Sequence, residues 1–77
     1  RYREAIASYD KALEMEPNTA NAWYSQAGCY VRLGKVNRAI DSLQQAINLN
    51  PHLYLELAQK DQDFVPLRRH ERFQAFF

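Results

Sequence analysis

Two stretches of this chain repeat at a fixed spacing of 34 residues, and each ends at a proline. The first covers residues 3–17 and the second covers residues 37–51. Five aligned pairs are identical: Ala5 and Ala39, Ile6 and Ile40, Ser8 and Ser42, Ala12 and Ala46, and Pro17 and Pro51. A period of roughly 20–50 residues is typical of proteins built from stacked, similar units. We therefore expect a stack that offers a recognition surface, and not a fold built around a catalytic pocket.

Apolar residues recur at steps of three and four along residues 1–15 and residues 36–49, which predicts an amphipathic helix in each segment. An aligned proline follows each helix, and proline disfavours helix at the residue before it. A further helix is predicted between them, over about residues 19–33. We expect Asn18 or Thr19 to cap its start, because a side-chain oxygen there can accept a backbone N–H bond.

Short connections and small residues predict that these helices pack closely. Gly34 is expected to close the middle helix in a left-handed conformation. Connections of two to three residues favour antiparallel neighbours. Alanines on the facing sides leave room for large side chains, and this alternation allows close approach. The expected small residues are Ala27, Ala39 and Ala46, and the expected large ones are Trp23, Tyr30 and Leu43.

The composition argues against two classes of partner. The 77 residues carry a net charge of +1, which gives no bulk attraction to nucleic acid or to an anionic membrane. No apolar run approaches the roughly 20 residues of a membrane span. The single Cys29 cannot form an internal disulfide, which fits a reducing, cytoplasmic location. We therefore expect a protein or peptide partner, with no nucleic acid and no membrane involved.

Residue types that carry catalysis are sparse. Cys29 lies in a predicted helix beside a core tyrosine, where cysteine usually acts as a small apolar residue. His52 and His70 show no metal-ligand spacing, and the chain has neither a Gly-rich phosphate loop nor a nucleophile elbow. The basic run at residues 68–72 contains Glu71 and is expected to be a solvated exterior. We expect no catalytic residue, no cofactor and no metal.

Residues 20–53 resemble the tetratricopeptide repeat (TPR), a helix–turn–helix unit of 34 residues. The matching residues are Trp23, Ala27, Tyr30, Gly34, Ala39, Leu43, Ala46 and Pro51. Gln26 departs from the pattern, because leucine is usual there, and it should loosen one core contact. The resemblance implies an all-α, right-handed αα-solenoid. Residues 1–17 would be the second helix of a preceding repeat, and residues 18–53 would be one complete repeat.

The next unit begins in register and then fails. Leu57 would take the place of Trp23, but a lysine and an aspartate replace the residues that allow close helix contact. Pro66 then falls where the helix should continue, and a proline inside a helix costs about 3 kcal/mol. The unit should therefore stop near residue 62, and residues 54–77 would form a capping helix and a cap.

Residues 61–77, here called the terminal segment, resemble the sequence that closes TPR arrays in many bacterial proteins, D-x-D-F-x-x-L-R followed by R-F-x-x and an apolar residue. The matching residues are Asp61, Asp63, Phe64, Leu67, Arg68, Arg72, Phe73, Phe76 and Phe77. A terminal unit must cover the apolar face of the last repeat and present a polar exterior. The residues expected to point inward are Phe64, Leu67, Phe73 and Phe76.

In TPR arrays the first helix of each pair lines a concave groove, so the resemblance implies a set of partner-binding residues. They are Asn21, Tyr24, Ser25, Gly28 and Arg32, with Leu55, Gln59 and Gln62 from the following helix. Tyr24 offers a rigid amphipathic surface, Gly28 lets a ligand approach the backbone, and Arg32 can pair with an acidic group. TPR domains that clamp the C-terminal carboxylate of chaperones use Lys and Asn at set groove positions. This chain has Tyr24 and Gly28 there, so binding of chaperone tails is not expected.

The sequence thus predicts a non-enzymatic scaffold that binds a peptide or partner segment in its groove. Two alternatives stay open: an array cap that self-associates through its first helix, and a regulatory tail of an upstream enzyme. The chain starts at Arg1, inside a repeat and without methionine, so we expect it to be the C-terminal piece of a longer protein.

Overall fold

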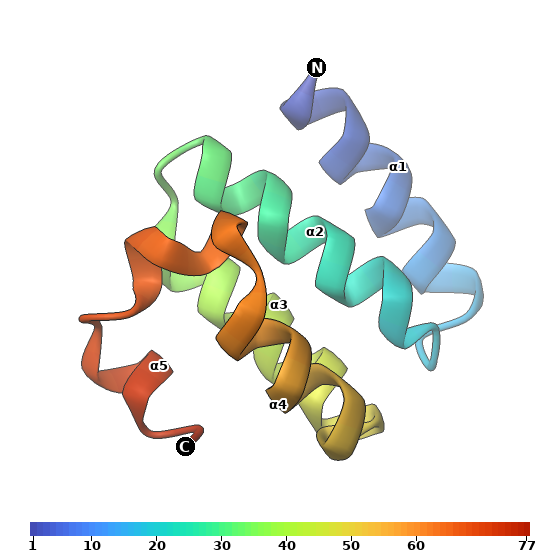
Figure 1. The fold of residues 1–77 in the computed structure, drawn as a ribbon. Helices are drawn as coiled ribbons and strands as arrows, with labels where there is room; N and C mark the ends of the chain where they lie inside the picture. Colours follow the sequence, from blue (N-terminus) through green and yellow to red (C-terminus); the bar gives the residue numbers. More distant parts are fainter.

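The computed structural model describes residues 1–77, and helices are its only regular elements (Figure 1). Their bounds are α1 Tyr2–Met15, α2 Ala20–Arg32, α3 Val36–Leu49, α4 Pro51–Lys60, the 3-10 helix η1 Gln62–Leu67 and the short α5 Glu71–Gln74. The all-α prediction is confirmed. None of the helices has both the length and the apolar character needed to cross a bilayer.

Helices α1, α2 and α3 lie side by side, each antiparallel to the one before it, and α2 packs against both neighbours (Figure 1). The three alanines predicted to lie where α2 and α3 meet their neighbours have no exposed surface, which confirms the predicted close packing. They are Ala27, Ala39 and Ala46. Leu43 is equally buried, whereas Trp23 and Tyr30 are half-buried at the edge of the core. Of the three large residues predicted to fill the core, Leu43 does so, whereas Trp23 and Tyr30 pack against its edge.

The start of α2 is held differently from the prediction. Thr19 occupies the N-cap position, but neither it nor Asn18 forms a side-chain cap bond, so that prediction is wrong. The indole Nε1 of Trp23 instead donates to the carbonyl oxygen of Pro17 at 2.8 Å. This bond fastens the first turn of α2 to the loop that follows α1.

The two glycines serve opposite purposes. Gly34 has a φ of +73° directly after α2, which confirms the predicted left-handed residue. Gly28 lies within α2, and a Cβ atom built there would meet nothing within 4 Å. The first glycine is required by the backbone, whereas the second leaves open space beside the helix.

Alanine at these two positions should change stability in opposite directions. Gly28→Ala should raise the free energy of unfolding by about 0.5–1 kcal/mol, because alanine stabilises a helix interior and meets no clash. Gly34→Ala should lower it by about 1–2 kcal/mol, because a Cβ atom disfavours the left-handed region. Urea unfolding followed by circular dichroism measures both. Shifts of the same sign would contradict the backbone assignment.

Gln26 is 2% exposed and connects three helices. Its Nε2 donates to Asp10 Oδ1 at 2.6 Å and to the carbonyl oxygen of Ile6 at 3.4 Å, both on α1. Its Oε1 accepts a bond from Ser42 Oγ of α3 at 3.2 Å. We expected Gln26 to loosen a core contact, but the structure shows a satisfied buried amide that links α1, α2 and α3.

Helix α4 begins three residues earlier than the repeat register predicts. Asn50 ends α3 and is also the N-cap of α4, where its Oδ1 accepts a bond from the backbone N–H of Leu53. The early start rotates the side chains of α4 relative to the expected register. Leu57, expected in the core in place of Trp23, is 37% exposed, while Tyr54 and Ala58 are buried.

The contact between α4 and α3 is less extensive than that between α2 and α3, which agrees with the expected loss of tight packing, but one small buried residue is kept. Ala58 is fully buried and supplies the small residue that the register assigned to Asp61. Helix α4 packs against α3 as its antiparallel neighbour (Figure 1). The change of register moves the small residue to a different position without removing it.

The terminal segment leaves α4 in a tight turn. Helix α4 ends at Lys60, and Asp61 caps η1 by accepting the backbone N–H of Asp63 on Oδ1 at 2.9 Å. Pro66 lies inside η1. The predicted stop near residue 62 agrees with these bounds, because the α-helix has already ended where proline would break it.

The terminal segment covers the core as the apolar pattern predicts. Phe64, Leu67 and Phe73 are buried, and Phe76 is half-buried. Arginines hold the segment from outside. Arg68 Nη2 donates to the carbonyl oxygen of Gln59 at 2.8 Å, and Arg72 Nη2 lies 2.6 Å from Asp41 Oδ1 on α3.

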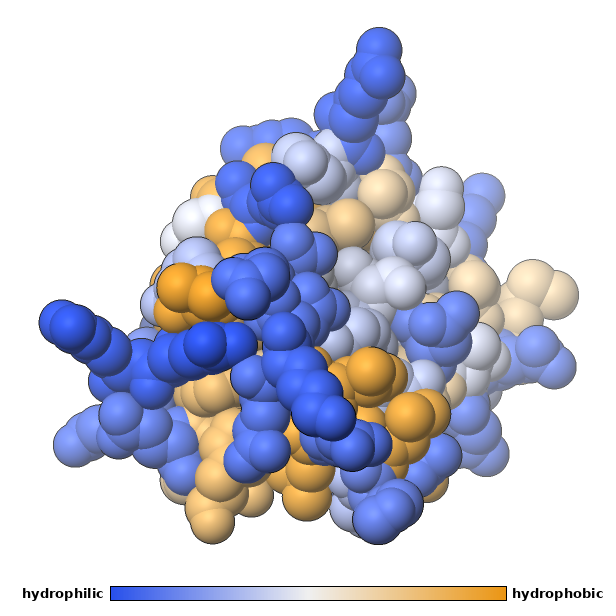
Figure 2. Space-filling view, in the orientation of Figure 1, coloured by the Kyte–Doolittle hydropathy of each residue, from blue (hydrophilic) through white to orange (hydrophobic).

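Exposed apolar side chains remain on the outer surface. On the face shown in Figure 2 they gather in separate patches near η1 and over α4, with polar residues between them. The exposed large apolar residues include Val65 of η1 and Leu53 and Leu57 of α4. Scattered exposed apolar residues of this kind are normal for a protein surface.

Candidate partner-binding site

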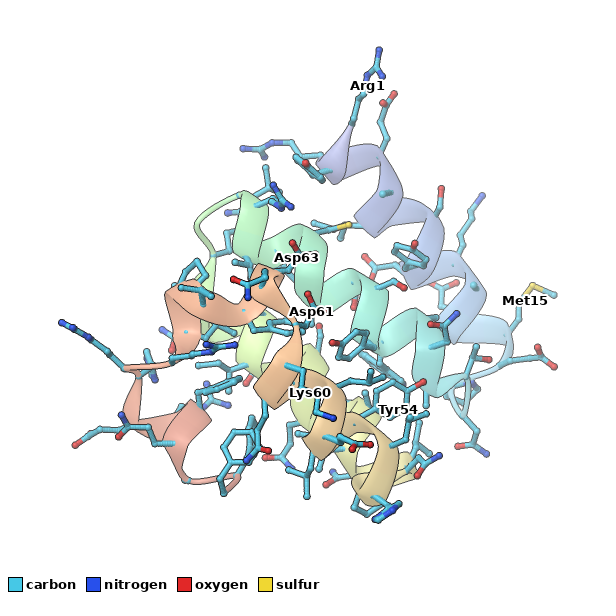
Figure 3. All side chains as sticks on the ribbon, viewed as in Figure 1. Arg1, Met15, Tyr54, Lys60, Asp61 and Asp63 are labelled. Carbon is cyan, nitrogen blue, oxygen red and sulfur yellow. The ribbon has the colours of Figure 1, made fainter.

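An open pocket of about 300 Å³ lies between α2, the start of α1 and the start of the terminal segment. Its lining residues are Tyr2, Tyr24, Ser25, Gly28, Cys29, Arg32, Asp61, Asp63 and Phe64. Because α2 supplies most of them, we call it the α2 pocket. Figure 3 shows Asp61 and Asp63 on the part of the terminal segment that passes in front of α2.

One wall of the α2 pocket is a single face of α2. Tyr24, Gly28 and Arg32 follow one another at steps of four, so these positions fall on one side of the helix. Gly28 has no side chain, and the space beside it is open. A bound group can therefore reach the helix backbone between a tyrosine and an arginine.

The opposite wall is formed by the terminal segment, and hydrogen bonds join it to α2. The hydroxyl of Tyr24 donates to Asp61 Oδ2 at 2.7 Å. Arg32 Nη2 donates to Asp63 Oδ1 at 2.8 Å, in an ion pair whose side chains are 53% and 45% exposed. The two polar groups that the sequence assigned to a partner are thus already joined to carboxylates of the same chain.

Aromatic rings form the base of this contact. The ring centroid of Tyr24 lies 5.1 Å from that of Tyr54 and 5.2 Å from that of Phe64, the latter edge-on. Burial, followed by the hydrogen bond to Asp61 and nearby negative charge, raises the pKa of Tyr24 above its ordinary value of 10.0. The hydrogen bond to Asp63 is the main reason why the pKa of Arg32 is raised. Tyr24 therefore acts as a neutral donor and Arg32 as a fixed cation.

Tyr24→Phe should lower the free energy of unfolding at neutral pH by about 1 kcal/mol, because the bond to Asp61 is lost while the ring packing stays. The raised pKa in the folded state means that this contribution is complete below pH 10 and is lost as the pH rises further. The difference between the wild-type and variant chains should therefore shrink at alkaline pH. Urea unfolding of both chains from neutral to strongly alkaline pH measures it, and a constant difference would exclude the linkage.

Cys29 lies at the edge of the α2 pocket and is half-buried. Burial raises the pKa of its thiol, which keeps the sulfur protonated and weakly nucleophilic at neutral pH. No group of three or more His, Cys, Asp or Glu side chains is placed to hold a metal ion. The pocket therefore offers polar and aromatic contacts to a bound segment.

The structure brings together four of the predicted partner-binding residues. Tyr24, Ser25, Gly28 and Arg32 all line the α2 pocket. The other predicted residues, Asn21, Leu55, Gln59 and Gln62, lie outside it. Gln59 is on the side of the terminal segment, where its carbonyl oxygen accepts the bond from Arg68. A role in partner binding stays a prediction for both sets.

Five lining residues were not among the predicted partner-binding residues. Two of them, Cys29 and Phe64, were expected to be buried apolar residues, and the other three are Tyr2, Asp61 and Asp63. Tyr2 belongs to α1, and Asp61 and Asp63 belong to the terminal segment, which we interpreted only as a cover for the core. The D-x-D spacing at residues 61–63 was the available signal. It marks two carboxylates at the start of η1, but nothing in the spacing indicates that they face Tyr24 and Arg32.

Comparison with known proteins places the chain among repeat proteins. The family model described as anaphase-promoting complex, cyclosome, subunit 3, matches residues 1–59. The chain is 31% identical over 51 residues to Hsp70-Hsp90 organizing protein 3 of Arabidopsis thaliana, covering 66% of this chain. It is 35% identical over 52 residues to tetratricopeptide repeat protein 33 of Homo sapiens, covering 68% of this chain.

These likenesses concern a small part of each relative. The matched region is 9% of the Arabidopsis protein and 20% of the human one. A third relative, serine/threonine-protein phosphatase T of Trypanosoma brucei brucei, is 38% identical over 47 residues, which cover 61% of this chain and 10% of that protein. No solved structure matches the chain. The similarity to each relative is therefore limited to its repeat region.

Proposed function

Because the chain belongs to the tetratricopeptide-repeat family, we propose that it is a non-enzymatic module that binds a peptide or partner segment in the α2 pocket. Relatives named as organizing proteins and repeat proteins support a role in protein–protein interaction in general. A cytoplasmic location belongs to the same proposal and is supported by the single free Cys29.

One observation carries the proposal: side chains predicted to bind a partner converge on a concave surface. Tyr24, Gly28 and Arg32 line one pocket, with open space above the glycine. Tyrosine contributes contact area at a low cost in conformational entropy. A segment laid along this face of α2 would bury apolar surface and form a few hydrogen bonds, without any change in covalent bonds.

The name of one relative raises the question of chaperone binding. The Arabidopsis relative is named Hsp70-Hsp90 organizing protein 3. In this chain Tyr24 and Gly28 stand where the carboxylate-clamping TPR domains carry Lys and Asn. Arg32 is already paired with Asp63. We therefore propose an internal peptide segment as the partner, in preference to a chaperone C-terminus.

Selection from a random peptide library displayed on phage tests the proposal. Peptides selected on the wild-type chain should lose at least about tenfold in affinity for Gly28→Trp, in which an indole fills the α2 pocket. Gln45→Trp is the matched control, because Gln45 is exposed on α3 and does not line the pocket. Circular dichroism checks that both variants remain helical. Selected peptides that bind Gly28→Trp as tightly as the wild-type chain would exclude the α2 pocket as the docking site.

A second candidate function is closure of a repeat array by the terminal segment. The observation in its favour is the burial of Phe64, Leu67 and Phe73 under a surface that carries arginines. This function is compatible with the first, because the same segment also forms one wall of the α2 pocket. Self-association through α1 stays a prediction, and sedimentation at several concentrations tests it.

A further inference from the structure

The charge that the α2 pocket offers differs from the charge that the sequence indicates. Arg32 suggests a site for an acidic group, but its guanidinium already lies 2.8 Å from Asp63 Oδ1. An acidic partner would have to displace Asp63 and approach Asp61, which lines the same pocket. Like charges in close contact disfavour binding. The arginine is therefore a poor anchor for a carboxylate.

The pocket has an excess of negative charge. Among its lining residues Arg32 is the one cation, and Asp61 and Asp63 are the two anions, which leaves a formal charge of −1. The whole chain has a net charge of +1, so the local sign is opposite to the overall one. At short range, therefore, the pocket should attract a positively charged group of the partner.

The carboxylate of Asp63 keeps the capacity to accept another bond. Asp61 uses Oδ2 for the Tyr24 hydroxyl and Oδ1 for a backbone N–H. Asp63 uses only Oδ1, for Arg32, and its side chain is 45% exposed. The second oxygen of Asp63 thus has no hydrogen-bond partner within the chain, and Asp63 lines the pocket.

Aromatic residues line the same pocket as the Asp63 carboxylate. Tyr2, Tyr24 and Phe64 line the α2 pocket, and Tyr2 is 44% exposed. The face of an aromatic ring attracts the cation of a lysine or arginine side chain. Gly28 leaves room for a long side chain to lie against α2. Ring faces, an open carboxylate oxygen and a bare helix backbone together suit an extended basic side chain.

We propose that the α2 pocket selects a partner segment that carries a lysine or an arginine, with its cation beside Asp63 and against the rings of Tyr2 and Tyr24. This inference rests on the proposed function, because it assumes that the α2 pocket is the docking site. It adds the chemical class of the partner: a basic peptide segment. It also changes the role of Arg32. The sequence suggested that Arg32 binds an acidic group of the partner, whereas here it orients Asp63 and repels the cation of the partner.

Two substitutions with opposite expected signs test the inference on the peptides selected above. Those peptides should be enriched in lysine and arginine. Asp63→Asn should weaken their binding about fivefold, because the accepting charge is lost. Arg32→Gln should strengthen it about twofold to fivefold, because a repelling cation is removed and Asp63 is freed. Raising the salt concentration should weaken binding to the wild-type chain.

The matched control is Asp41→Asn, which removes an aspartate paired with an arginine outside the α2 pocket. It should leave affinity unchanged. Enrichment of acidic peptides, or weaker binding to Arg32→Gln, would overturn the inference while leaving the α2 pocket as the docking site. Binding that is insensitive to Gly28→Trp would overturn the proposed function itself, and the inference with it. Circular dichroism confirms that each variant is folded, and the exposure of both side chains favours folding.

Discussion

Phe64→Ala should lower the free energy of unfolding by about 3–5 kcal/mol. Phe64 is 1% exposed, and its ring packs edge-on against that of Tyr24. Truncation would leave a cavity beneath η1, and the fixed hydrogen bond between Tyr24 and Asp61 would oppose its collapse. Since a whole domain is stable by about 5–15 kcal/mol, this change removes a large fraction of the total.

Urea unfolding followed by circular dichroism measures the change. Val65→Ala is the matched control, because Val65 is the next residue of η1 and is 46% exposed. It should cost less than about 0.5 kcal/mol, the range of ordinary surface substitutions. Equal effects at the two positions would show that η1 does not pack against α2 in solution.

Removal of residues 63–77 should produce a chain that aggregates or unfolds. The deletion takes away three buried side chains, Phe64, Leu67 and Phe73. At about 1.5–3 kcal/mol each, their burial contributes roughly 5–9 kcal/mol. The loss also exposes Tyr54 and Ala58 of α4, which the terminal segment helps to cover. An apolar surface of this kind promotes association between copies.

Sedimentation velocity and the melting temperature of the shortened chain measure this outcome. Arg72→Gln is the matched control, because it breaks the exposed ion pair with Asp41 and keeps every apolar residue of the terminal segment. An exposed ion pair contributes at most about 1 kcal/mol, so this variant should remain monomeric. A shortened chain that stays soluble with an unchanged melting temperature would contradict the covering role.

Periodicity in the sequence was sufficient to predict the helices and the residues that hold them together. The repeat places Ala27, Ala39 and Ala46 where helices touch, and all three are fully buried. Gly34 follows α2 with the positive φ that a helix end of this type requires. These features depend on neighbours in sequence, or on a repeat that the chain itself displays.

The position of α4 could not be predicted in the same way. Pro51 was interpreted as the end of α3, yet it is also the first residue of α4, a position that suits proline because no N–H bond is needed there. Gln26 was interpreted as a defect for a similar reason. Its partners Asp10 and Ser42 lie on other helices, and their approach depends on the packing.

The candidate site shows the same limit. The spacing of Tyr24, Gly28 and Arg32 on one helix face was visible in the sequence. The arrival of Asp61 and Asp63 opposite them was not, because it depends on the turn between α4 and η1. A one-residue shift in that turn would place other side chains against α2. The sign of the charge in the α2 pocket therefore could not be predicted from the sequence, because it depends on where the fold places these two aspartates.

Trp23 is the sole tryptophan of this chain and is therefore a natural fluorescent reporter. Its hydrogen bond to Pro17 ties its emission to the loop between α1 and α2. The indole borders a hollow lined by residues of α1, α2 and α3, with none from the terminal segment. Its emission should consequently change when α1 separates from α2. It should change little when the terminal segment detaches. Emission and far-ultraviolet dichroism can thus distinguish opening at one end of the molecule from opening at the other.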